Sequence, residues 1–107
     1  MKVYEPAAWT SVRTIRQYGE LAGRGDPDAA AHAWTDAGFD DATTARWLEA
    51  RCFDAPAARA MADMGVEPEQ AAKRTRDGGG HVDTIAYKVA NGDLTARQGA
   101  ARTLSSR

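Results

Sequence analysis

Three side chains in this sequence could bind a metal ion or act in nucleophilic catalysis: His32, Cys52 and His81. A zinc site needs several such ligands together, usually at short spacings in the chain. No second His or Cys stands three or four positions from any of the three. A Cys–His nucleophile pair is an alternative, but Cys52 stands beside Phe53 where a helix is expected to end, which favours a half-buried structural thiol. We therefore predict no metal ion, no cofactor and no enzymatic activity.

The triple glycine at residues 78–80 could bind an anion, because consecutive glycines can point backbone N–H groups at a phosphate. The lysine and the strand of a P-loop are absent around it. A flexible loop between two helices accounts for the glycines more simply. We therefore predict an interhelical loop there.

Residues 57–76 offer a different chemistry, nucleic-acid recognition. A helix, a turn at Gly65 and a second helix at 68–77 have the spacing of a helix-turn-helix. In this alternative the second helix presents four polar or basic side chains to DNA, namely Gln70, Lys73, Arg74 and Arg76. Glu67 and Glu69 at the start of the same helix would repel phosphate, and a nearly neutral chain has little non-specific affinity for DNA.

The charges balance overall but are segregated along the chain. Fourteen Lys and Arg residues stand against fifteen Asp and Glu residues, a net charge of -1. Such a chain has no overall field that draws it to nucleic acid or to an anionic membrane. Residues 26–41 hold five Asp residues and no Lys or Arg, whereas residues 84–107 are mildly basic. An acidic surface suits a basic partner protein, and it could also imitate nucleic acid.

The cysteine content, the first residues and the apolar runs of the sequence indicate the cellular compartment. One cysteine allows no intrachain disulfide, which favours a reducing compartment. The first residues do not resemble a signal peptide, and no apolar run approaches the roughly 20 residues that span a bilayer. The chain is rich in Ala, Arg and Asp, as is common in GC-rich bacterial genomes. We expect a cytoplasmic protein without a membrane segment.

From Trp34 onward the chain repeats a unit of 13 or 14 residues. Each unit begins with a large or branched residue, and a Gly or Cys followed by an apolar residue comes about four positions later. An acidic or hydroxyl residue and several alanines then follow. A glycine past a helix adopts the left-handed conformation, the apolar residue behind it folds back, and the acidic residue caps the next helix. The units predict short helices at about 27–37, 41–51, 55–64, 68–77, 83–90 and 95–104.

The chain before the repeat predicts one longer helix, from Pro6 to about Ala22. Its apolar residues recur every three positions, and this stripe could cover the core or form a homodimer. Strand signals are nearly absent. We predict an all-α single domain over 1–107, a compact globule of six or seven short helices with a longer N-terminal helix at 1–23 and repeat units at 26–104. Its expected core is Trp34, Phe39, Trp47, Phe53, Met61, Val66, Ile85, Tyr87, Val89 and Leu94.

Two stretches resemble ubiquitin-associated (UBA) domains, a family with a three-helix fold. The first has Met64-Gly65-Val66, Ala71, and then a Gly-His-Val-Asp turn at 80–83 and Ile-Ala-Tyr at 85–87. The stretch Ala37-Gly38-Phe39 begins a second, less complete match that shares a helix with the first. In that family a Met-Gly-Phe loop engages an apolar patch on a protein partner, so the resemblance implies that these loops are contact sites. The alternative is that they are helix-ending glycines with apolar lids.

These observations favour a small non-catalytic protein-binding module, acting as an adaptor, regulator or inhibitor through an acidic and apolar surface. The partner is expected to be another protein, with a DNA-binding regulator as the alternative. The predicted contact residues are Asp28, Asp36, Phe39, Asp40, Asp41, Met64 and Val66.

Overall fold

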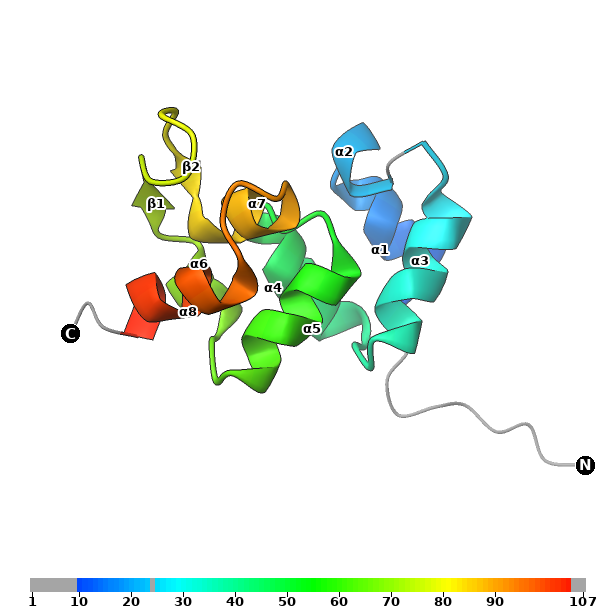
Figure 1. Cartoon of the computed structure of the whole chain (residues 1–107). Coiled ribbons are helices and arrows are strands. Elements are labelled where there is room, and N and C mark those ends of the chain that lie inside the picture. Colours follow the sequence, from blue (N-terminus) through cyan, green and yellow to red (C-terminus); the bar gives the residue numbers. More distant parts are fainter. Residues whose placement is uncertain (1–9, 24, 105–107) are drawn as a thin grey trace, which may run out of the picture.

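Figure 1 shows the computed structural model, which describes residues 10–23 and 25–104. This part of the chain forms eight helices and one pair of strands. In chain order they are α1 (Val12–Gln17), α2 (Glu20–Gly23), α3 (Pro27–Asp36), α4 (Asp41–Glu49), α5 (Ala55–Asp63), α6 (Pro68–Ala71), β1 (Arg74–Thr75), β2 (Asp83–Thr84), α7 (Ile85–Ala90) and α8 (Ala96–Leu104). The prediction of a compact, mostly helical globule is confirmed, but the expectation that strands are absent is wrong. Within the described residues, no helix is long and apolar enough to cross a membrane.

The repeat corresponds to one turn that ends α3, α4, α5 and α7. At α7 the backbone N–H of Asp93 donates to the carbonyl of the buried Lys88 (2.8 Å), and Gly92 has a φ of 87°. The three earlier turns have the same geometry. In each case a backbone N–H donates to the carbonyl of a buried residue five positions earlier: Phe39 to Trp34 (3.1 Å), Cys52 to Trp47 (3.0 Å) and Val66 to Met61 (3.1 Å). The residue just before the donor has a positive φ, as this turn requires: 88° at Gly38, 68° at Arg51 and 87° at Gly65. Cys52 therefore occupies the place of Phe39, and not that of Gly38 as predicted.

The predicted helix starts hold within one residue for α3, α4, α5, α6 and α8, whereas the helix predicted from 83 begins at Ile85, after the strand β2. The carboxylates of Asp26, Asp40 and Asp54 cap α3, α4 and α5 by accepting a backbone N–H from three residues on. Thr95 and Gln98 form a reciprocal pair of hydrogen bonds before α8, at 2.9 and 3.0 Å. Because each short helix has its own start and stop, its boundaries could be predicted from local sequence.

The predicted helix at 68–77 forms only in its first four residues, as α6. It ends at Ala71, and the chain then turns and becomes extended, so that Arg74 pairs with Thr84 in an antiparallel ladder. The backbone N–H of Ile85 donates to the carbonyl of Lys73 (2.8 Å), which fixes this register. The triple glycine lies in the connection between β1 and β2, where all three glycines have positive φ. A hairpin of this kind depends on pairing between residues eight and ten positions apart, which helical periodicity does not report.

The predicted N-terminal helix is shorter and broken. Its start at Pro6 lies outside the described residues, and α1 begins at Val12 with Ser11 as its cap. Gly19 has a φ of 88° and separates α1 from α2, since a left-handed residue cannot continue a helix. Both short helices pack against α3. The break lets α2 turn away from the path of α1.

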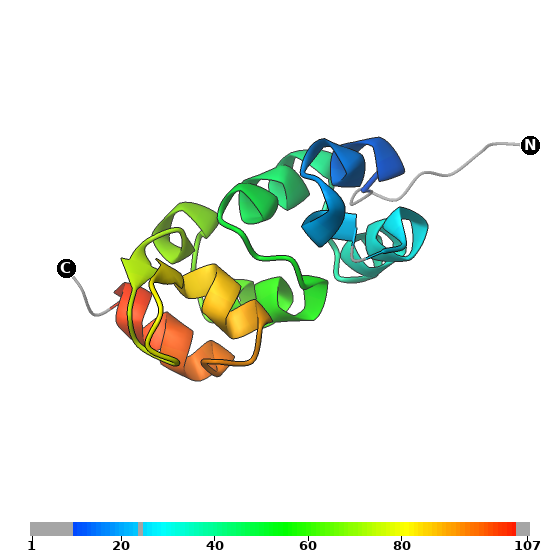
Figure 2. The same cartoon turned by 90° about the horizontal axis from the view of Figure 1, so that it is seen from above.

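The helices are arranged around α4 and α5 at the centre of the molecule (Figures 1 and 2). On one side lie α1, α2 and α3, and on the other lie α6, α7, α8 and the hairpin. One core cluster runs through all three regions, from Ile15 through Trp47 to Ala100. Of the predicted core residues, Phe53 and Tyr87 stand apart because they are half-buried, and they mark the site described next.

Candidate functional site

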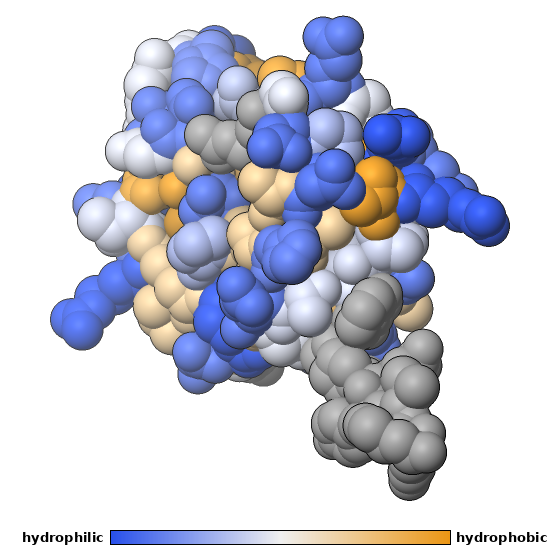
Figure 3. Space-filling model, turned by 90° about the vertical axis from the view of Figure 1, so that its right-hand side faces the viewer, coloured by the Kyte–Doolittle hydropathy of each residue, from blue (hydrophilic) through white to orange (hydrophobic). Residues whose placement is uncertain are grey.

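The acidic residues predicted to contact a partner have different roles in the structure. Asp28 and Asp36 are exposed on α3. The Asp40 carboxylate accepts the N–H of Thr43 (2.8 Å) as the cap of α4, and this hydrogen bond holds the pKa of Asp40 below its usual value. Asp41 is also exposed, and its carboxylate is hydrogen-bonded within the fold. Figure 3 views the molecule from the side of α1 and α3, a face on which hydrophilic residues predominate and hydrophobic ones are scattered.

The Asp41 carboxylate joins α4 to the beginning of α1. Its Oδ1 accepts the backbone N–H of Ser11 (2.8 Å) and the hydroxyl of Thr14 (2.7 Å). The N–H of Ser11 is the main reason that the pKa of Asp41 lies below its usual value, and burial opposes it. Beside it, the buried Thr10 hydroxyl donates to the carbonyl of Phe39 (2.8 Å). This polar network fastens α1 to the rest of the fold.

Two of the predicted apolar contact residues are in the core. Phe39 and Val66 are 4% and 3% exposed, because the left-handed glycine before each one turns it back against its own helix. They act as the lids of the repeated turn, so their prediction as surface contacts is corrected. Met64 is 40% exposed at the end of α5, as a contact residue should be.

The residues of the DNA-binding alternative do not share a helix. Gln70 is in α6, where its Oε1 accepts the N–H of Glu67 (2.7 Å), and Arg74 is in β1. Lys73 and Arg76 flank β1 and are exposed. Because α6 ends at Ala71, the recognition helix that this alternative requires is not present in the structure.

The triple-glycine loop is held by a buried lysine that the sequence did not single out. Lys88 is 0% exposed, and its Nζ donates to the carbonyl of Asp77 (2.6 Å) and to the carbonyl of His81. These carbonyls stand at either side of the glycines. A Cβ on Gly78 would approach the carbonyl oxygen of Asp93 to 2.8 Å, so the loop also packs closely on the α7–α8 connection. The loop is a rigid part of the fold.

The potential metal ligands are not gathered. Within residues 10–23 and 25–104, no three side chains of His, Cys, Asp or Glu come together as a metal site would need. Cys52 is 0% exposed, and burial raises the pKa of its thiol to about 12. A thiol that is both inaccessible and protonated is a poor nucleophile.

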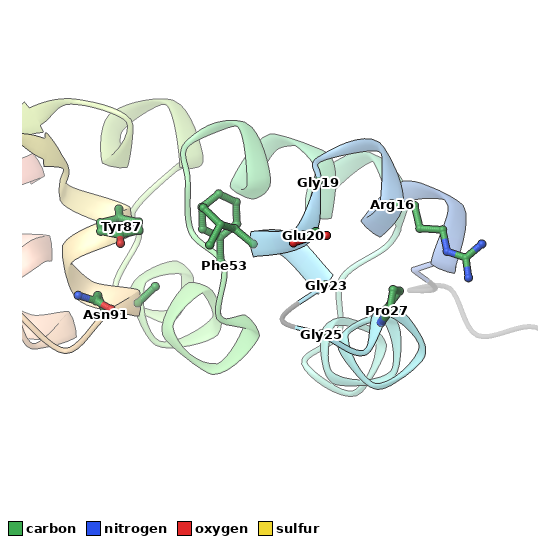
Figure 4. A pocket seen from close by; sticks show the side chains of 11 residues that line it. Arg16, Gly19, Glu20, Gly23, Gly25, Pro27, Phe53, Tyr87 and Asn91 are labelled. Carbon is green, nitrogen blue, oxygen red and sulfur yellow. The ribbon is translucent and has the colours of Figure 1, made fainter.

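A groove of about 840 Å³ lies between α2 and α7. In Figure 4, Phe53 stands in its middle, with Tyr87 and Asn91 on one side and Gly19, Glu20, Gly23 and Gly25 on the other. Leu21, Pro27 and Ala90 add to the apolar lining, and Arg16 lies at one end. We call these eleven residues the α2–α7 groove. It combines an aromatic floor, a wall that includes the exposed Gly19 and Gly25, and a charged rim.

The aromatic part of the groove is fixed from behind by Arg51. The rings of Phe53 and Tyr87 meet edge to face, with centroids 6.3 Å apart. The Arg51 guanidinium lies over both, 4.7 Å from the Tyr87 centroid and 5.7 Å from that of Phe53. It also forms a two-pronged ion pair with Asp83 (2.8 and 3.1 Å), which raises the pKa of Arg51. Burial acts to raise the pKa of Asp83, but Arg51 and the N–H of Thr84 outweigh it and leave that pKa lowered.

The sequence contained two signals of this groove. Trp34 and Trp47 are 13 positions apart, whereas Trp47 and Met61 are 14 apart, and the added residue before the next cap is Phe53. The glycines at 19, 23 and 25 are the second signal, because each leaves its backbone without a side chain. Neither signal by itself could indicate that α7 lies on the other side of the groove from α2.

Comparison of the chain with protein-family models, with characterised proteins and with solved structures found no match. The resemblance to UBA domains therefore stays a prediction.

Proposed function

We propose that this chain is a small non-catalytic protein-binding module and that its docking site is the α2–α7 groove. The observation that carries this proposal is Leu21, which is 58% exposed beside the half-buried rings of Phe53 and Tyr87. Exposed leucines are common on protein surfaces when they stand alone. An exposed leucine at the edge of an aromatic groove is different, because together they offer a continuous apolar surface that a partner can cover.

The construction of the groove fits a protein partner. Interfaces between proteins have an apolar centre that excludes water and a polar rim that sets orientation. Here the centre is formed by Leu21, Phe53 and Tyr87, and the rim by Arg16 and Glu20. The volume of about 840 Å³ lies in the range that holds a small ligand or a few side chains of a partner. Because Arg51 holds the aromatic rings in place, little side-chain entropy is lost when the groove is filled.

The acidic stretch can contribute at the edge of this site. Pro27 lines the groove, and the exposed Asp28 follows it in the first turn of α3. A basic residue of a partner at this edge would meet an acidic one, which favours encounter and orientation more than affinity. Met64 is at the end of α5 and borders a second, shallower hollow with Arg97, Ala101 and Leu104.

The test is affinity capture from cells that naturally contain this protein, with a tagged chain as bait at moderate salt. We expect the bait to retain a protein that a Leu21→Asp bait does not retain, since a carboxylate in the groove cannot be desolvated cheaply. An untagged copy of the chain itself counts as such a protein. Met64→Asp is the matched control, because Met64 is also exposed but lies outside the groove. If both baits retain the same proteins as the unchanged chain, the groove is not the docking site.

A further inference from the structure

We propose that the β1–β2 hairpin is a second binding surface of this chain and that it contacts the phosphate backbone of double-stranded DNA. The contacting residues are Lys73, Arg74 and Arg76, which we call the hairpin cations. This surface is separate from the α2–α7 groove and does not depend on the function proposed for that groove. Three features carry the assignment: unpaired positive charge, a fixed projecting shape and separation from the acidic residues.

The hairpin cations are exposed and lie within the four positions 73–76. None of them forms an ion pair or a side-chain hydrogen bond with another residue in the part of the chain that the structure describes. Burial acts to raise the pKa of Asp83, Arg51 lowers it, and Arg74 lowers it more weakly. Arg51 already holds this carboxylate at 2.8 Å, so Arg74 keeps its hydrogen-bond donors for a partner.

The carboxylates that flank the hairpin cations in sequence are held by other arginines. Asp77 accepts a hydrogen bond from Nε of Arg102 (2.8 Å), which is the main reason that the pKa of Asp77 lies below its usual value. Glu67 and Glu69, which were expected to repel phosphate, both pair with Arg46, at 2.9 and 2.6 Å. Arg46 cancels one of these two charges and holds both side chains against α4. Positive charge therefore predominates on β1.

The hairpin has a fixed base and a projecting end. The backbone N–H of Ile85 donates to the carbonyl of Lys73 (2.8 Å), and the buried Lys88 ammonium donates to the carbonyls of Asp77 and His81. In Figure 1 the connection between the two strands extends beyond the helices. Because the backbone of the hairpin is already ordered, only the side chains of the hairpin cations lose conformational entropy when an anion binds.

This shape favours a DNA duplex as the partner. The major groove of B-DNA is about 12 Å wide and admits a two-stranded β-ribbon. Four residues of chain span at most about 14 Å, a length in which one strand of the duplex carries about four phosphates. Each hairpin cation can therefore meet a phosphate of its own. The two arginines also present planar guanidinium groups, whose geometry matches phosphate oxygens.

Two other polyanions fit the hairpin less well. An interface with an acidic protein needs an apolar centre, but Val82 is the one large apolar residue in the sequence 72–84. The unpaired bases of a single strand stack on aromatic rings, and this stretch contains no Phe, Tyr or Trp. A duplex, which presents its phosphates outward, requires neither feature.

The acidic stretch lies too far away to oppose this contact. Figure 1 places α3, which carries the exposed Asp28 and Asp36, on the other side of α4 and α5 from the hairpin. One helix with its side chains is about 10 Å across, whereas the Debye length at physiological salt is about 8 Å. The nearly neutral net charge therefore describes the whole chain but not the field at the hairpin.

The test is the binding of the full-length chain to a short fluorescent duplex of arbitrary sequence, followed by anisotropy. Three phosphate contacts correspond to a slope of about -2.7 for the logarithm of the binding constant against that of the salt concentration. We expect a Kd of about 100 µM at about 150 mM salt and a value roughly 200-fold lower at about 20 mM.

Each hairpin cation is then replaced by glutamine, which is polar but uncharged. Lys73→Gln, Arg74→Gln and Arg76→Gln should each reduce the size of the slope by about 0.9 and weaken binding at low salt by roughly tenfold or more. The triple variant should lose binding and salt dependence together. Arg13→Gln is the matched control and should change neither quantity, because Arg13 is exposed on α1, on the far side of α4 and α5. Circular dichroism confirms that these variants of exposed residues are folded.

Absence of binding at low salt overturns the proposal. An Arg13→Gln variant that weakens binding as much as Arg76→Gln also overturns it, because the attraction then comes from the whole chain and not from the hairpin. Polyglutamate of equal total charge is the competitor: if it displaces the labelled duplex as effectively as unlabelled duplex does, the hairpin is a surface for acidic proteins and the assignment to DNA is wrong. These outcomes leave the α2–α7 groove untouched, since its test is capture through Leu21.

Discussion

Asp41 provides a direct test of whether the acidic stretch serves the fold or a partner. The structure assigns the Asp41 carboxylate to the fold, through the N–H of Ser11 and the hydroxyl of Thr14. Asp41→Asn keeps the shape and one acceptor oxygen but removes the charge. A hydrogen bond to a charged group is worth about 1.5–3 kcal/mol and a neutral one about 0.5–1.5 kcal/mol. With allowance for solvent exposure of this carboxylate, we expect the two bonds together to lose about 1 kcal/mol.

Asp41 also begins α4, and a negative charge in the first turn of a helix contributes about 0.3–1 kcal/mol. The expected decrease in the free energy of unfolding is therefore about 1.5 kcal/mol in all. Asp28→Asn is the matched control, because Asp28 is in the first turn of α3 and is exposed, but accepts no hydrogen bond from another described residue. It should lose only the helix contribution, about 0.5 kcal/mol.

Urea unfolding followed by circular dichroism at neutral pH measures both variants. Because the pKa of Asp41 is lowered in the folded protein, its stabilisation is present above the pKa of the unfolded chain and disappears as the pH falls through the folded pKa. The difference between the unchanged protein and Asp41→Asn should therefore narrow as the pH falls from about 5 to about 2. Equal losses for Asp28→Asn and Asp41→Asn at neutral pH would refute this reasoning.

Two further predictions concern the triple-glycine loop and Cys52. Gly78→Ala and Gly80→Ala both place a side chain at positive φ, but a Cβ on Gly78 would lie 2.8 Å from a backbone oxygen and a Cβ on Gly80 meets nothing within 4 Å. Gly80→Ala should cost about 1 kcal/mol of strain and Gly78→Ala about 3 kcal/mol, measured by thermal unfolding; equal costs would contradict the close packing of the loop. Cys52 should react with a thiol reagent only at the rate of unfolding, because its thiol is covered and has a pKa of about 12. Rapid labelling without denaturant would show that Cys52 is accessible.

The helices α3, α4, α5 and α8 could be located from sequence because each carries its own signals. Asp40 at a helix start and Gly38 at a helix end act through hydrogen bonds to residues a few positions away. The helix predicted at 68–77 failed for the opposite reason. Its residues have adequate helix propensity, but Arg74 and Thr75 instead pair with the strand at 83–84, which tertiary contacts bring alongside.

The candidate site also contains residues whose place could be predicted from local sequence and residues whose place depends on tertiary packing. Asp28, Asp36 and Met64 are at the surface, as predicted, because polarity and helix ends could be read locally. Phe39 and Val66, which were predicted both as core residues and as contacts, are buried. The glycine before each one indicated a lid that folds back on its helix, and the packing of the core decides for the lid and against a surface contact. Asp41 is exposed, and its carboxylate is also hydrogen-bonded within the fold.

The sequence by itself determined the short-helix units, their caps and the left-handed turns that close four of them, because these depend on backbone hydrogen bonds within five residues. It also showed that Phe53 is an added residue in one repeat unit, but not that this residue forms the floor of a groove. Only the tertiary structure decided that Phe53 faces Tyr87 and that α2 stands opposite α7 to form a groove. The reason is that α4 and α5 are packed between two groups of helices, α1–α3 on one side and α6–α8 on the other, and set the distance between these groups. That separation leaves Leu21 exposed beside an open hollow.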